Sequence, residues 1–140
     1  MSRLVVDASV GVKWFLPEPD DERALALLRS EHDLSAPDLM YPEVGNALWK
    51  RCRRGDLTLR DVDDAVDRLL AAPIIVHPSS ALLPLALTLA LRMAQPVYDC
   101  LYVAAALAHD GRLVTADRRL LNAFGRGPLS RRVVAIEDVR

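Results

Sequence analysis

Five short runs of β-branched and apolar residues, separated by longer helical patterns, restrict most strongly how this chain of 140 residues can fold. The runs lie at 3–7, 34–36, 74–77, 112–115 and 132–136. Strands separated by helices need crossover connections, and such connections build a mostly parallel sheet with helices on both faces. The sequence therefore predicts an α/β protein with three layers, α/β/α.

Helical patterns fill the intervals between the runs, and local signals mark several of their ends. Pro17 and Pro19 stop the first helical segment, because proline has no amide hydrogen to donate. Thr58 is placed to cap the segment that starts at Leu59. No repeat or linker interrupts the pattern, so we expect one domain over residues 1–140. The helical segments are 8–16, one opening at 20–22, 38–54, 59–72, 79–93, 98–109 and 117–124.

Composition excludes several other classes of protein. A chain that is 51% hydrophobic is too apolar to be disordered. Its longest apolar run, 81–91, contains Pro84 and Thr88 and is too short to span a bilayer, so we expect no membrane association. The N-terminus lacks the pattern of a signal peptide. Cys52 and Cys100 belong to no motif and fit a reducing cytoplasm.

Acidic residues stand at or near the ends of predicted strands, where open parallel sheets bind their ligands. Asp7 ends the first strand, and Asp117 follows the fourth by two residues. Glu43 and Asp99 lie in the first turns of two predicted helices. Each acid also has a simpler explanation, because Asp caps helices and acids in a first turn complement the helix dipole.

The apolar surroundings of these acids favour a metal site over capping alone. Asp7 and Asp117 follow apolar strands, and Asp99 is embedded in the apolar run 97–104. Desolvated carboxylates at one sheet edge repel one another and are costly unless a cation pairs with them. Mg²⁺ and Mn²⁺ prefer such oxygen ligands. The sequence therefore predicts a site for a divalent cation.

The same residues carry a family resemblance. Four segments, in this order and in these strand and helix contexts, resemble the acidic motifs of PIN-domain proteins. The short chain is also similar to the VapC toxins of VapBC toxin–antitoxin modules, and the resemblance covers residues 1–137. The segments are Val5-Val6-Asp7-Ala8-Ser9, Pro42-Glu43-Val44, 98–104 and Thr115-Ala116-Asp117-Arg118-Arg119-Leu120.

This resemblance implies a PIN-like fold and a metal-dependent endoribonuclease that acts as a toxin, commonly as a homodimer controlled by a VapB-like antitoxin. It assigns the site to Asp7, Glu43, Asp99 and Asp117. Asp7, Asp99 and Asp117 would hold Mg²⁺ or Mn²⁺, and Glu43 would bind metal or orient the attacking water. RNA cleavage would then leave a 5′-phosphate and a 3′-hydroxyl.

Other residues extend the expected site. Ser9 and Thr115 match hydroxyl positions that often assist the acids in this family. Asn46 lies one helical turn after the second acid and shares its face. Arg118 and Arg119 directly follow the fourth acid, so we expect them to bind the RNA backbone.

The sequence does not decide whether two further features bind partners or only belong to the folded structure. The basic stretch 50–54 either grips RNA or is an ordinary solvated helix end. Trp14 and Phe15 either pack in the core or form a hydrophobic groove for an antitoxin segment, as in VapC-like proteins. Such a segment often brings an Arg or Lys toward the acidic site.

Rival classes fit less well. A receiver domain needs paired acids after its first strand and a lysine after a late one, whereas Ala8 and Ser9 follow Asp7 and the lysines are Lys13 and Lys50. Ser9 also breaks the Asp-x-Asp motif of phosphatases. An RNA-processing PIN nuclease outside a toxin module and a non-catalytic interaction domain stay open. The net charge of −1 includes the four acids, so it does not argue against an RNA substrate.

Overall fold

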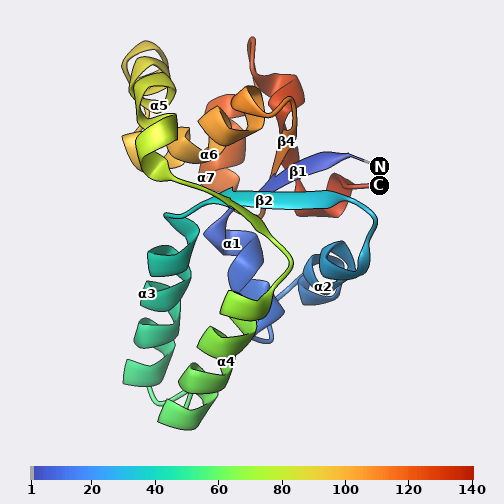
Figure 1. Ribbon diagram of the computed structural model, residues 1–140, viewed down its shortest axis with the longest axis vertical. Helices are drawn as coiled ribbons and strands as arrows, with labels where there is room; N and C mark the ends of the chain where they lie inside the picture. The colour runs from blue at the N-terminus through green and yellow to red at the C-terminus, as the bar shows by residue number, and fades with distance from the viewer. Residues whose placement is uncertain (1) are drawn as a thin grey trace.

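The computed structural model describes residues 2–140, which build a sheet of five parallel strands (Figure 1). The order across the sheet is β3-β2-β1-β4-β5, so strand order reverses between β1 and β4. Ligands bind open parallel sheets beyond the carboxyl ends of strands at such a switch point. The strands are β1 (Arg3–Val6), β2 (Asp33–Pro37), β3 (Ile75–His77), β4 (Arg112–Thr115) and β5 (Val133–Ala135).

Helices cover both faces of this sheet, which confirms the predicted three layers (Figure 1). One face carries α1 (Ala8–Gly11), the 3-10 helix η1 (Val12–Trp14), α2 (Asp21–Arg29), α3 (Met40–Arg53) and α4 (Leu59–Ala71). The other carries α5 (Ser79–Met93), α6 (Val97–Ala108) and α7 (Arg118–Phe124). Two further 3-10 helices, η2 (Ser130–Arg132) and η3 (Ile136–Asp138), flank β5.

Capping residues and prolines set the helix ends largely as the sequence predicts. The Thr58 hydroxyl accepts from the amide of Asp61, whose side chain accepts from the amide of Thr58, so the two form a capping box on α4. Pro42 lies in the first turn of α3, where its missing amide hydrogen breaks no helical bond. The segment predicted as a helix over 8–16 is instead a single α-turn that tightens into η1 before Pro17.

The core lies where the two helical layers meet the middle strands. Residues 4–6 and 113–114 are buried, and α6 is buried over 100–106. The apolar run 74–77 predicts a buried strand; the strand is confirmed as β3, but the expectation that it is buried is wrong. Ile75 is 59% exposed and Val76 is 38% exposed, because β3 is an edge strand of the sheet.

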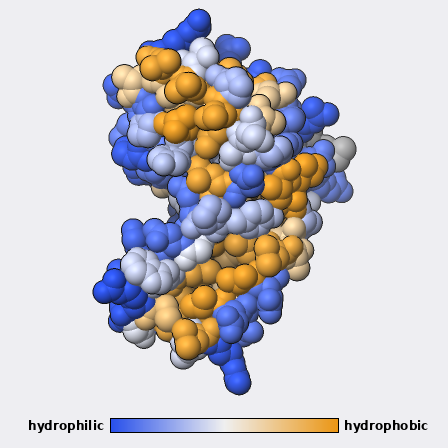
Figure 2. Space-filling view, turned by 60° about the vertical axis from the view of Figure 1, so that its left-hand side comes forward, coloured by the Kyte–Doolittle hydropathy of each residue, from blue (hydrophilic) through white to orange (hydrophobic). Residues whose placement is uncertain are grey.

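Large apolar side chains remain on the surface. Figure 2 shows them in two areas separated by a hydrophilic band, one around α5 and one around α3 and α4. No single helix in the described part of the chain is long and apolar enough to cross a membrane; α5 and α6 qualify only when joined across a bend of 117°. The exposed set is Trp49, Leu59, Leu70, Ile75, Val76, Leu83, Leu87, Leu91 and Tyr98.

Candidate active site

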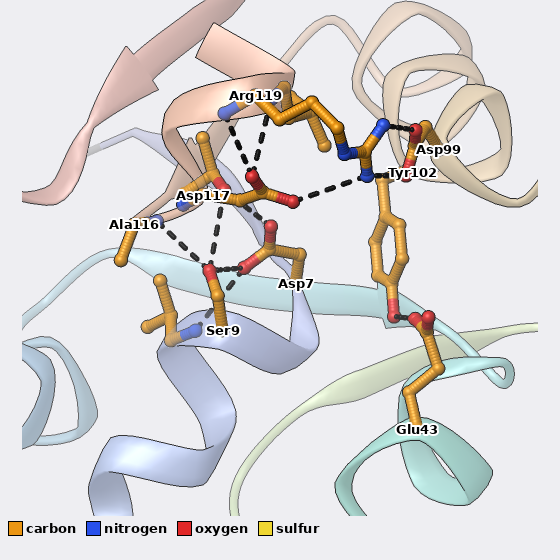
Figure 3. A network of polar contacts seen from close by, with 11 residues as sticks. Asp7, Ser9, Glu43, Asp99, Tyr102, Ala116, Asp117 and Arg119 are labelled. Carbon is orange, nitrogen blue, oxygen red and sulfur yellow. Dashed lines mark hydrogen bonds and ion pairs between the residues drawn. The ribbon is translucent and has the colours of Figure 1, made fainter. Parts of the chain in front are cut away.

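Asp7 lies at the centre of a polar network directly after β1 (Figure 3). Its carboxylate accepts hydrogen bonds from the hydroxyls of Ser9 and Thr115 and from the amide of Val10. The bond from Val10 makes Asp7 the N-cap of α1, so its capping role and its place in the site coexist. Asp7 is only 4% exposed, and burial raises the pKa of its carboxyl to about 6.

Ser9 on α1 and Thr115 at the end of β4, both expected to assist the acids, lie beside Asp7. Their hydroxyl oxygens lie 3.3 Å apart. The Ser9 hydroxyl also accepts from the amide of Ala116 at 2.9 Å, and the Thr115 hydroxyl accepts from the amide of Asp117 at 3.0 Å. These bonds fix the loop that follows β4, and with it the direction of the Asp117 side chain.

Asp99 and Asp117 are bridged by one guanidinium group (Figure 3). Arg119 donates to both carboxylate oxygens of Asp99, at 2.6 and 3.2 Å, and to Oδ2 of Asp117 at 3.3 Å. Asp117 Oδ1 accepts from the amides of Arg119 and Leu120, so Asp117 is also the N-cap of α7. Arg119, which the sequence predicts to bind RNA, therefore has its guanidinium between two of the acids.

Glu43, in the first turn of α3, is held by a residue that the sequence did not single out. Tyr102 lies on α6 one turn after Asp99, is buried, and donates its hydroxyl to Glu43 Oε1 at 2.5 Å (Figure 3). Burial and the bond to Glu43 raise the pKa of Tyr102, so the phenol stays a donor. The signal available in the sequence was its spacing from Asp99, which puts both side chains on one helix face.

The four acids influence one another electrostatically. Burial raises the pKa of Glu43, and the negative charges of Asp99 and Asp117 raise it further. Asp117 also raises the pKa of Asp7. Like charges held this close favour any cation that can lie between them.

Hard divalent cations match this donor set, because all four side chains offer carboxylate oxygens. The acids nevertheless converge less closely than the sequence predicts: in residues 2–140, no three carboxylates, histidines or cysteines are grouped tightly enough to hold a metal ion. Each acid is engaged by a neighbour, Asp7 by hydroxyls, Glu43 by Tyr102, and Asp99 with Asp117 by Arg119. Arg119 shows that the site accepts positive charge between two of its acids.

Other predicted residues lie apart from this network. Arg118 forms an ion pair with Glu137 on η3. Asn46 is exposed, and within the described residues no hydrogen bond joins it to an acid. The basic stretch 50–54 lies at the end of α3, roughly 10–16 Å along the helix from Glu43. Arg51 there pairs with acidic side chains on neighbouring segments, which favours a structural role for part of this stretch.

The predicted partner groove is corrected at Trp14. The residue is 2% exposed, and its indole nitrogen donates to the carbonyl oxygen of Ala24 at 2.9 Å, so Trp14 is a core residue. Phe15 is partly exposed and lies beneath the guanidinium of Arg68, 5.5 Å from ring centre to Cζ. It lines a cavity of 260 Å³ with residues of α4 such as Asp64.

Fold and site together define an α/β protein whose switch point carries four acids from four different segments. The PIN domain family model matches residues 4–125. Over 124 residues, the chain is 36% identical to Ribonuclease VapC3 of Pyrobaculum aerophilum, covering 87% of this chain and 95% of that protein. It is 34% identical over 128 residues to Ribonuclease VapC1 of Mycobacterium tuberculosis, covering 89% and 93%.

Solved structures share the fold. The crystal structure of PAE2754 from Pyrobaculum aerophilum superposes with a TM-score of 0.71 at 24% identity, covering 97% of this chain and 85% of that one. A toxin-antitoxin complex from Klebsiella pneumoniae gives 0.65 at 14% identity, covering 97% and 99%. The chain belongs to the PIN domain family, and its sequence relatives bear the name Ribonuclease VapC.

Proposed function

We propose that this chain is a metal-dependent endoribonuclease and the toxin of a type II toxin–antitoxin module. The observation that carries the proposal is that Asp7, Glu43, Asp99 and Asp117 lie around one switch point and influence one another electrostatically. Burial and mutual repulsion raise the pKa values of Asp7 and Glu43, so the site is under electrostatic strain that a divalent cation would relieve. The relatives named Ribonuclease VapC support RNA as the substrate.

Different residues of the chain would hold the metal and activate the water. Asp7, Asp99 and Asp117 would hold Mg²⁺ or Mn²⁺, with Asp7 fixed by its two hydroxyl neighbours. The bond from Tyr102 aims the Glu43 carboxylate, which would orient the attacking water and accept its proton. A bound divalent cation would supply charge neutralisation at the scissile phosphate and a lower pKa for bound water.

RNA would approach the acids from the side of the site on which the exposed guanidinium of Arg119 lies. This side chain is 59% exposed, and a guanidinium offers paired donors that match phosphate oxygens. Arg118 would add positive charge nearby but is directed to Glu137, so we expect it to contribute less than Arg119 to RNA binding.

Two protein partners belong to the proposal. A second copy of the chain would cover the apolar stripe of Leu83, Leu87 and Leu91, which are exposed at successive turns of α5. A VapB-like antitoxin would dock near Phe15, the accessible part of the predicted groove, and the shared fold with the toxin-antitoxin complex from Klebsiella pneumoniae supports a partner of this kind. Cys52 and Cys100, both free thiols, fit a cytoplasmic site of action.

The proposal is tested by incubating the purified chain with RNA in Mg²⁺ or Mn²⁺ and by inducing it in cells without an antitoxin. We expect internal cleavage and growth arrest for the wild type, and neither for Asp99→Asn. Asp33→Asn is the matched control, because Asp33 is an exposed acid at the opposite end of a neighbouring strand. We expect this control to cleave RNA like the wild type.

Each rival function gives a different result in the same experiment. An RNA-processing nuclease would cleave RNA without stopping growth. A non-catalytic interaction domain would leave RNA intact, and its wild type and Asp99→Asn variants would behave alike. Either outcome would contradict the corresponding part of the proposal.

A further inference from the structure

Arg119 uses the same carboxylate oxygens that a divalent cation would need. It contacts both oxygens of Asp99 in the paired geometry of a guanidinium and carboxylate, and it reaches Oδ2 of Asp117 with the same nitrogen that binds Asp99 Oδ1. The other oxygen of Asp117 is occupied by backbone amides of α7. In the metal-free chain, one internal cation therefore offsets part of the negative charge of this acid pair.

We propose that Arg119 is an exchangeable internal cation, which holds Asp99 and Asp117 in the metal-free chain and leaves them when a divalent cation binds. This inference rests on the metal site of the proposed function. It goes further by making one side chain a competitor of the metal and, once released, a ligand for substrate phosphate.

Burial of the partners makes the exchange feasible. The Asp99 side chain is 15% exposed and that of Asp117 is 33% exposed, whereas that of Arg119 is 59% exposed. The acids are thus fixed by their helices while the guanidinium can rotate into solvent. Because its guanidinium side is open to solvent, this ion pair contributes only modest stability, and a divalent cation, which attracts both carboxylates, can displace it.

Release of Arg119 would link metal binding to substrate binding. While its guanidinium is paired with Asp99 and Asp117, its donors are committed to the chain's own acids. After displacement, the same donors lie on the first turn of α7, next to the site, and are free for a phosphate. The contribution of Arg119 to RNA binding is then present only in the metal-loaded protein.

The neighbouring arginine provides a matched control. Arg118 precedes Arg119 on the same first turn, is equally charged, and pairs with Glu137 instead of the acids. Arg118→Met and Arg119→Met remove the same charge, so they change the general electrostatic field alike. A difference in metal affinity between them reports the local contact.

The experiment is calorimetric titration of Mn²⁺ into the full metal-free chain without RNA. We expect Arg119→Met to bind Mn²⁺ about two- to fivefold more tightly than Arg118→Met, the range that losing an exposed competing ion pair allows. Arg119→Lys should fall between, because lysine keeps the charge but not the paired donors. Equal affinities, or weaker binding by Arg119→Met, would overturn the exchange and leave the metal site standing.

A second measurement follows Arg119 itself. In NMR spectra of the metal-free wild type, we expect the side-chain nitrogen signals of Arg119 to show restricted rotation and to lose it when Mg²⁺ is added. Signals that do not respond to a bound metal would overturn the exchange. If neither the wild type nor any variant binds Mn²⁺, the metal site of the proposed function fails, and the exchange fails with it.

Discussion

Replacing Asp7 with Asn should stabilise the metal-free chain at neutral pH while abolishing RNA cleavage. The Asp7 carboxylate is buried at 4% exposure, and burial raises its pKa from 3.8 to about 6. An amide of the same shape has no charge to desolvate. Its oxygen can still accept the bonds from Ser9 and from the Val10 amide, so the cap on α1 is kept.

The size of this effect follows from the linkage between protonation and folding. The difference between 3.8 and about 6 corresponds to about 3 kcal/mol. Because the pKa is raised in the folded chain, Asp7 contributes its full stability below about pH 4 and loses it as pH rises through about 6. The amide also weakens the bond from Thr115, so we expect the Asn variant to be about 1–3 kcal/mol more stable than the wild type at about pH 8.

Urea unfolding of both proteins in EDTA measures this difference. The gain from Asp7→Asn should be near zero at about pH 4 and reach its full value at about pH 8. Asp61→Asn is a control of opposite sign, because hydrogen bonds of the capping box lower the pKa of Asp61. Its stabilising charge is present at neutral pH and lost on acidification, so that variant should be less stable at neutral pH. A loss of stability in Asp7→Asn, or a gain that does not change with pH, would refute the reasoning.

Three further predictions concern other parts of the molecule. Tyr102→Phe removes the hydroxyl that lowers the pKa of Glu43. We therefore expect kcat to fall about tenfold and the acid limb of the pH–rate profile to move to higher pH. Tyr98→Phe is the exposed control and should behave like the wild type. A change in KM alone would contradict this role. Thr58→Ala breaks the capping box and should lower the free energy of unfolding by about 1 kcal/mol without changing cleavage. Mg²⁺ should raise the melting temperature of the wild type but not of Asp99→Asn, and equal shifts would contradict metal binding at this site.

Much of the fold could be predicted because its signals are local. Alternating strand and helix patterns indicated the layers, and Thr58 marked the start of α4. Asp7 and Asp117 could be located at strand ends, because an acidic residue there serves both helix capping and ligand binding. The exposure of β3 was missed, because an apolar run does not reveal whether its strand lies at the edge of the sheet.

Pairings between distant segments could not be read from the sequence. Tyr102 and Glu43 are far apart in the chain, and a tyrosine inside an apolar helix is equally compatible with simple packing. Arg119 was expected to face RNA, yet unpaired acids in the folded chain attract it first. Trp14 was ambiguous because aromatic residues serve both cores and interfaces, and its bond to a backbone carbonyl decides for the core.

The central claim is that the four acids form one metal-dependent site for RNA cleavage. Single-turnover cleavage of end-labelled RNA, measured while Mg²⁺ is titrated into metal-free protein, tests it most directly. We predict cleavage that saturates with Mg²⁺, stops with EDTA, leaves a 5′-phosphate, and is lost in Asp7→Asn, Glu43→Gln, Asp99→Asn and Asp117→Asn. Cleavage that persists in EDTA, or that survives in both Asp7→Asn and Asp99→Asn, would contradict the account.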